Sequence, residues 1–79
     1  VGIEPLAVRN YLAELPDVIQ VHDLHIWATS TTETALTAHL VMPAGHPGDA
    51  FLVRVVRELH ELFGIDHPTL QIEVGDPSY

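Results

Sequence analysis

The sequence predicts an α+β domain in which a helix, a β-hairpin, a second helix and a last strand follow one another. Apolar residues recur at helical spacing in two segments, residues 3–15 and 51–63, and alternate with polar residues in three others, residues 21–30, 34–42 and 69–74. Turn-forming residues separate these segments. The order αββαβ favours a three-stranded sheet with both helices on one face.

The first helix is expected over residues 3–15. Pro5 suits the first turn of a helix and Pro16 its end. The apolar residues near helical spacing are Ile3, Leu6, Leu12 and Leu15. A hairpin should follow, because the polar cluster Ser30-Thr31-Thr32-Glu33 separates the first two alternating segments.

The second helix is expected to begin after a segment rich in proline and glycine, residues 43–48. Asp49 stands where an N-cap residue would accept hydrogen bonds from the next turn, and Gly64 is placed to cap the end. The apolar face of this helix comprises Phe51, Leu52, Val55, Val56, Leu59, Leu62 and Phe63.

The third strand is expected over residues 69–74, with Leu70, Ile72 and Val74 on one side. The whole order resembles a ferredoxin-like arrangement that lacks its first strand. Because both helices would cover the same face of the sheet, the opposite face should stay open.

The length of the chain indicates one domain, residues 1–79, with a thin core. Domains of this size often gain stability from a disulfide, a metal ion or a partner subunit, and the chain has no cysteine. A metal or self-association therefore remains as the expected source of added stability.

The charge of the chain excludes some partners and favours others. Eleven acidic residues against three arginines give a net charge of -8, which disfavours binding to nucleic acid and to anionic lipid. The same field attracts cations, and six histidines supply nitrogen ligands. No apolar run approaches the about 20 residues that cross a bilayer, and no signal peptide is recognisable, so we expect a soluble segment without direct membrane insertion.

The register of the hairpin decides which side chains meet, because a slip of one residue sends every side chain to the wrong face. We predict a register that places apolar pairs on the face covered by the helices and His25 opposite His39 on the open face. The predicted pairs are Leu24 with Leu40, Ile26 with Ala38, Ala28 with Leu36, His25 with His39, and Trp27 with Thr37. Opposed β-carbons lie about 5 Å apart, so two imidazoles could bind one ion.

Glu73 is expected on the same face, because it has the opposite parity to Leu70 and Ile72, and it is a candidate third ligand. His22 and His67 flank regular strand segments and are candidates at the rim of the site. His22 and His25 lie three residues apart, which on a regular strand places them on opposite faces, so one ion taking both would need a bend there.

Several of these residues also have a structural interpretation. The paired histidines could form a solvated polar strand face, and Trp27 could serve either a dimer contact or packing within one subunit. His60 is expected as a half-buried helix residue and His46 as a solvated loop residue.

The segments VHDLHIWATSTTETALTAHLVM, residues 21–42, and HPTLQIE, residues 67–73, carry a family resemblance. The chain resembles the cytoplasmic C-terminal domain of cation diffusion facilitators, and most of all that of bacterial cobalt-zinc-cadmium efflux proteins. The resemblance spans nearly the whole chain and implies a metallochaperone-like αββαβ fold. Several eukaryotic relatives have a C-terminal cysteine pair, which this chain lacks.

The resemblance implies a regulatory domain on the cytoplasmic face of the bacterial inner membrane. It would form a homodimer, act with the transmembrane domain of the same metal/proton antiporter in heavy-metal efflux, and bind Zn2+, with Cd2+, Co2+ and Ni2+ also admissible. The positions that match family metal ligands are His22, His25, His39, His67 and Glu73. Some family ligands follow the last strand or come from the other subunit, and Asp76 is a candidate of that kind.

Two other functions remain open, although the chain is not expected to be an enzyme. One is a metal-independent structural dimerisation module with solvated histidines. The other is a small metal-dependent hydrolase, which would need an open metal coordination position and a general base such as Glu33 or Asp23.

Overall fold

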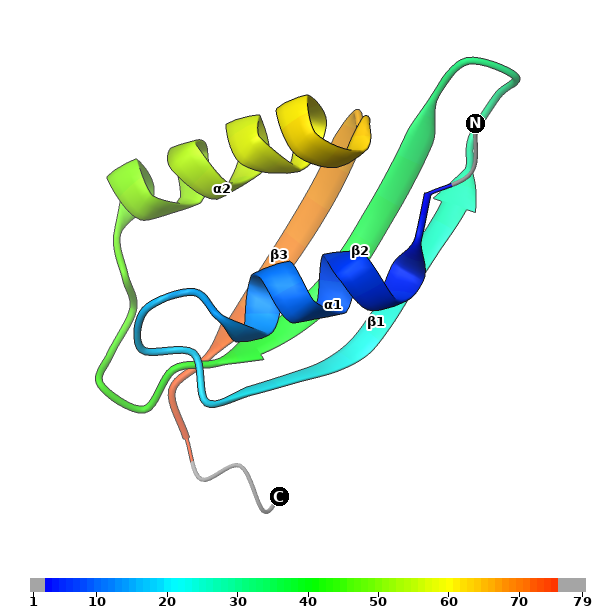
Figure 1. Cartoon of the computed structure of the whole chain (residues 1–79). Coiled ribbons are helices and arrows are strands. Elements are labelled where there is room, and N and C mark those ends of the chain that lie inside the picture. The colour runs from blue at the N-terminus through cyan, green and yellow to red at the C-terminus, as the bar shows by residue number, and fades with distance from the viewer. Residues whose placement is uncertain (1–2, 76–79) are drawn as a thin grey trace.

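The computed structural model describes residues 3–75 of the chain. Its elements follow one another as α1 (Pro5–Ala13), β1 (Gln20–Ala28), β2 (Thr34–Val41), α2 (Asp49–Phe63) and β3 (His67–Glu73) (Figure 1). The predicted α+β class and the order αββαβ are therefore confirmed. Within this range neither helix combines the length and the apolar character that crossing a membrane requires.

α1 is shorter than the predicted helix over residues 3–15. It begins at Pro5, whose fixed φ angle suits the first helical position, and it buries Val8 and Leu12 completely. Leu6 was expected on the apolar side but is 66% exposed. The reason is geometric: at about 100° of rotation per residue, Leu6 lies on the side of the helix opposite Val8 and Leu12.

The two ends of α2 differ in how well the sequence predicted them. The expectation that Asp49 is the N-cap is wrong, because Gly48 takes that position with a φ of 91° and Asp49 is the first helical residue. Its carboxylate still lies in the first turn, where the helix dipole favours negative charge. Gly64 caps the other end as predicted, in the left-handed conformation with a φ of 72°.

The predicted apolar face of α2 is only partly buried. Val55 and Leu59 are inaccessible to solvent, whereas Phe51 and Phe63 are half-buried and pack against the core. Leu62, which was predicted on the same face, is 62% exposed. The helix therefore attaches to the sheet through a narrow stripe of side chains.

The sheet has the strand order β1-β2-β3, with β1 antiparallel and β3 parallel to β2. β2 is the central strand and most of its side chains are buried. β3 is an edge strand and contains Pro68. Proline is tolerated in an edge strand, because an amide that would face solvent can be lost without breaking the ladder.

One face of the sheet supports the core. Alternate residues of β2 on that face, Leu36, Ala38 and Leu40, belong to the same buried cluster as side chains of both helices. Figure 1 shows α1 crossing in front of β1 and β2. The cluster consists of Val8, Leu12, Leu15, Val21, Leu36, Ala38, Leu40, Met42, Val55, Leu59 and Ile65. The prediction that both helices cover one face is confirmed.

The predicted hairpin register is wrong. His25 pairs with Thr37 and not with His39, and His22 takes the place opposite His39. The other pairs in the regular part of the hairpin are Ile26 with Leu36, Trp27 with Ala35, and Ala28 with Thr34. The five predicted pairs therefore do not form, and Ala28, expected on the covered face, is exposed.

Two local features explain the difference in register. The loop closes more tightly than expected, because the backbone N–H of Thr29 donates to the carbonyl of Glu33 at 2.9 Å. The observed pairing in the hairpin is offset by two residues from the predicted pairing, which leaves every side chain on its original face. In addition, the register shifts between His22 and His25, which marks a β-bulge.

Candidate metal centre

The face of the sheet opposite the helices carries mostly polar side chains, arranged in rows across the strands. Residues that pair directly on neighbouring strands share a face of the sheet. Four rows cross β1, β2 and β3 on this face. They are Gln20, Val41 and Glu73; His22, His39 and Gln71; His25, Thr37 and Thr69; and Trp27, Ala35 and His67. All four predicted ligand histidines therefore lie on the open face. His22 and His25 are on β1, His39 is on β2 and His67 is on β3.

The β-bulge in β1 brings both histidines of the His-x-x-His pair to the open face. His22 pairs with His39, and His25 pairs with Thr37, which lies two residues from His39 on the same face. Between them Asp23 adopts a left-handed conformation with a φ of 52°. This is the bend that the sequence required if His22 and His25 were to share a face.

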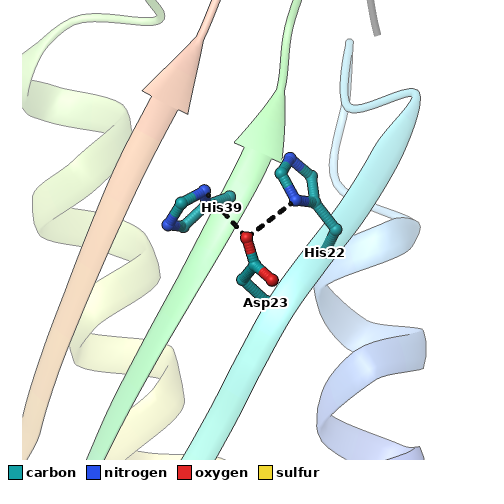
Figure 2. Close-up of side chains that lie close together, drawn as sticks. All are labelled: His22, Asp23 and His39. Carbon is teal, nitrogen blue, oxygen red and sulfur yellow. Dashed lines mark hydrogen bonds and ion pairs between the residues drawn. The ribbon is translucent and has the colours of Figure 1, made fainter. Parts of the chain in front are cut away.

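His22, Asp23 and His39 form the cluster shown in Figure 2. Asp23 Oδ2 lies 3.2 Å from His22 Nδ1 and 3.5 Å from His39 Nδ1. One ligand atom from each of the three residues lies within 4.8 Å of the others, which is close enough for one metal ion. The imidazole rings meet edge to face with their centroids 4.9 Å apart.

Glu73 joins the two histidines from β3. Its Oε1 lies 2.7 Å from His22 Nε2, and its Oε2 lies 2.8 Å from His39 Nδ1. Gln71 donates from Nε2 to Glu73 Oε2 at 3.1 Å. The side chain of Glu73 is only 18% exposed. The carboxylate is thus held at the end of the parallel strand, where both imidazoles reach it.

The remaining predicted site residues lie apart from this cluster. His67 pairs with Ala35, four residues along β2 from His39, which is a separation of about 13 Å on a strand. Its Nε2 lies 2.8 Å from Glu33 Oε1. His25 is exposed beside Thr37. Asp76 lies outside the described residues.

The histidines outside the open face have local contacts. The side chain of His60 is 64% exposed, more than the half-buried state that was predicted, and its Nε2 lies 3.7 Å from Asp66 Oδ1. His46 is exposed in the loop before α2, as expected, and its Nδ1 accepts a hydrogen bond from the backbone N–H of Gly48 at 3.0 Å.

Sequence reasoning did not assign Asp23 to the metal cluster. A signal was present, because the strict alternation of β1 is interrupted between Val21 and Leu24, which are three residues apart and both pack in or against the core. Two apolar residues at that spacing require a bulge, and aspartate is one of the few residues that tolerates the left-handed conformation a bulge can demand.

The contacts within the cluster shift two pKa values in opposite directions. The hydrogen bond to Glu73 raises the pKa of His22 above its ordinary value, and Asp23 adds to the effect. The hydrogen bond from His22 lowers the pKa of Glu73, and His39 contributes in the same direction. Without metal, the carboxylate therefore stabilises a positively charged His22.

These shifts predict how the stability of the metal-free domain depends on pH. His22 contributes its full stabilisation of the folded domain below about pH 6.5, and this stabilisation is lost as pH rises through its raised folded-state pKa. Glu73 contributes its full stabilisation above about pH 4.5, and this is lost as pH falls through its lowered folded-state pKa. The melting temperature of the unmodified domain should exceed that of the Glu73→Gln variant by the largest amount between about pH 4.5 and about pH 6.5.

Thermal melting in the presence of a chelator, at pH values from about 4 to about 8, measures this dependence. Glu61→Gln is the control, because Glu61 is exposed on α2. A constant difference between the domain and Glu73→Gln over the whole range would contradict the pairing of Glu73 with a protonated His22.

The donor set determines what the cluster can hold. Imidazole nitrogens and carboxylate oxygens that converge within a few ångströms suit zinc and other first-row divalent ions. Fold and site together define the class of the protein: an α+β domain that covers one face of its sheet with helices and presents a histidine and carboxylate cluster on the other.

Comparisons with known proteins place the chain in a family. The family model ZT_dimer, described as "Cation efflux protein, cytoplasmic domain", matches residues 3–74. The chain therefore belongs to the family of cytoplasmic domains of cation efflux proteins.

A solved structure has the same fold. This structure, "Metal-bound C-terminal domain of the CzcD transporter from Cuprividus metallidurans", is 33% identical, with a TM-score of 0.79 over 90% of this chain and 99% of that chain. Its fold matches the two helices and the mixed sheet seen here.

Two curated relatives are much longer than this chain. "Probable proton-coupled zinc antiporter SLC30A3" from Bos taurus is 35% identical over 98% of this chain, and "Metal tolerance protein 1" from Oryza sativa subsp. japonica is 31% identical over 90% of it. The matched parts span 19% and 17% of the length of these relatives.

Proposed function

We propose that this domain binds a divalent metal ion, zinc before others, on its open sheet face and thereby regulates a metal/proton antiporter of which it is the cytoplasmic part. The ligands in this proposal are His22, His39 and Glu73, with Asp23 at the same cluster. One observation carries the proposal: imidazoles from two neighbouring strands each lie within 2.8 Å of the same carboxylate, which comes from the third strand.

The geometry supports metal binding more than a solvated polar face. Glu73 and both histidines are largely screened from solvent, with side chains between 18% and 34% exposed. In a merely solvated face, side chains of these types would extend into water. The similar CzcD domain is described as metal-bound, which agrees with the proposal.

The family resemblance predicts His25 and His67 as ligands too, but neither belongs to the central cluster. Both lie on the open face, but His25 is opposite Thr37 and His67 contacts Glu33. We therefore assign the central ion to His22, His39 and Glu73 and give the other two histidines no part in it.

Metal can regulate the transporter only if the domain has two states that bind metal differently. A homodimer that closes when metal binds is the simplest such arrangement. Trp27 is 47% exposed on the open face, and an exposed tryptophan there favours a contact between subunits. A metal that binds only the closed dimer stabilises it by about 2.7 kcal/mol when its concentration is a hundredfold above Kd. That energy is sufficient to bias a transporter between two states.

A zinc titration of the purified domain, followed by calorimetry and light scattering, tests this function. We expect saturable binding, an increase in molar mass when zinc is added, and a return to the starting mass with a chelator. His60→Ala serves as the control, because His60 lies on α2 away from the cluster. Absence of saturable binding would refute the proposal. Binding without a change in mass would refute the dimerisation part.

The alternative function is a metal-independent dimerisation module. The exposed Trp27 would serve both functions equally well. This alternative predicts a dimer whose mass and melting temperature do not change when zinc or a chelator is added, so the same titration distinguishes the two.

A further inference from the structure

The β-bulge at Asp23 decides which side chains of β1 face the metal site. From Gln20 to His22, β1 pairs with β2 in one register, and from His25 to Ala28 it pairs one residue out of step. Two residues of β1, Asp23 and Leu24, therefore face a single residue of β2. Before the bulge the even-numbered residues of β1 lie on the open face, and after it the odd-numbered residues do.

Without the bulge, one histidine would enter the core. If the register of the hairpin continued to the start of β1, His22 would pair with Leu40, which is completely buried. If the register at the start of β1 continued toward the hairpin, His25 would pair with Leu36, which is also buried. A regular strand therefore cannot place both histidines on the open face.

The bulge depends on a conformation that few residue types adopt. Asp23 has a φ of 52°, and among the described non-glycine residues only Asp17 shares a positive φ, at 69°. Residues other than glycine, asparagine and aspartate are disfavoured in this conformation, and β-branched residues most of all. A residue that disfavours it would favour the regular strand.

We propose that Asp23 is a positioning residue for the metal site, acting through its backbone conformation: the left-handed bulge that it forms places His22 opposite His39. This inference rests on the proposed function, because it concerns how the metal ligands are placed. It is separate from any contact that the carboxylate of Asp23 makes with the ion.

The test compares Asp23→Gly with Asp23→Val. Both variants delete the carboxylate, but glycine accepts the positive φ whereas valine resists it. In calorimetry we expect the valine variant to bind zinc about tenfold more weakly than the glycine variant, or weaker still. Equal zinc affinities of the two variants would overturn the inference.

Asp17→Gly and Asp17→Val are the matched control pair. Asp17 is the same residue type, is also exposed and has a similar φ, but it lies in the loop between α1 and β1. We expect this pair to differ in melting temperature and to bind zinc equally. If the Asp17 pair shows the same difference in zinc affinity as the Asp23 pair, general destabilisation explains both and the inference is wrong.

Nuclear Overhauser contacts between the backbones of β1 and β2 give a readout that needs no metal. The unmodified domain and Asp23→Gly should show the pairing of His22 with His39, and Asp23→Val should lose it. If Asp23→Val does not fold, Asp23→Ala replaces it in both measurements. Retention of this pairing in the valine or alanine variant would overturn the inference.

The two measurements separate the inference from the proposed function. If the domain binds no zinc but the backbone pairing responds as expected, the proposed function is wrong and the role of the bulge in placing His22 stands. If the domain binds zinc and the Asp23 variants bind it equally, the function stands and the positioning role is wrong.

Discussion

Replacement of both His22 and His39 by alanine is expected to lower the affinity of the domain for zinc by at least about a hundredfold, because even the loss of a residue that only orients a metal ligand costs about 10- to 100-fold. The two rings supply nitrogen donors from neighbouring strands and share Glu73. Without them the cluster keeps only carboxylates, which hold zinc weakly in water.

Zinc calorimetry on the single and double variants measures this loss. The losses in zinc-binding free energy of the two single variants should add up to more than the loss of the double variant, because residues that bind the same ion are not independent. His25→Ala is the matched control on the same strand and face, and it should change the affinity little because His25 lies opposite Thr37. An affinity that drops for His25→Ala and not for His22→Ala would place the ion elsewhere.

Replacement of Leu59 by alanine is expected to lower the free energy of unfolding by about 2–5 kcal/mol, the usual range for a buried leucine. Leu59 is inaccessible to solvent on α2 and belongs to the core cluster. A domain of this size has a total stability of roughly 5–10 kcal/mol, so the variant should be close to unfolding in the absence of metal.

Leu62→Ala makes the same chemical change on the same helix at a side chain that is 62% exposed. It should change the free energy of unfolding by less than about 0.5 kcal/mol. Urea denaturation with a chelator present compares the two variants. Similar losses for both would mean that α2 does not attach to the sheet through the stripe that contains Val55 and Leu59.

The fold could be predicted because several local signals agreed. Proline at the start of α1, glycine after α2 and the alternation in three segments each favoured the same order of elements. The pattern of the first helix was misjudged at Leu6 because an apolar residue near helical spacing need not lie on the buried stripe. Val8, which is fully buried, marks the true face of α1.

The hairpin register could not be chosen from the apolar pattern. A slip of two residues keeps every side chain on its face, so Ile26 meets an apolar partner whether it pairs with Ala38 or with Leu36. The contacts of the loop between Thr29 and Glu33 decide between them, and they depend on backbone geometry that the alternation of side chains does not encode.

The positions of the candidate site residues could be predicted only in part, because they too depend on backbone geometry. His39 and Glu73 were expected on the open face, and both lie in the cluster. His22 was expected only at its rim and His25 at its centre, and the structure reverses these positions. The reversal follows from the bulge, since a strictly alternating strand would have turned His22 away from His25.

The proline in β3 and the bulge in β1 have a consequence for how copies of the domain can meet. Each of the two outer strands of the sheet is interrupted: β3 lacks the amide donor of Pro68, and β1 is distorted at Asp23. Such interruptions deter a foreign strand from extending a sheet sideways. Edge-to-edge pairing of sheets from different copies is therefore opposed, which favours association through side chains over association through strand edges.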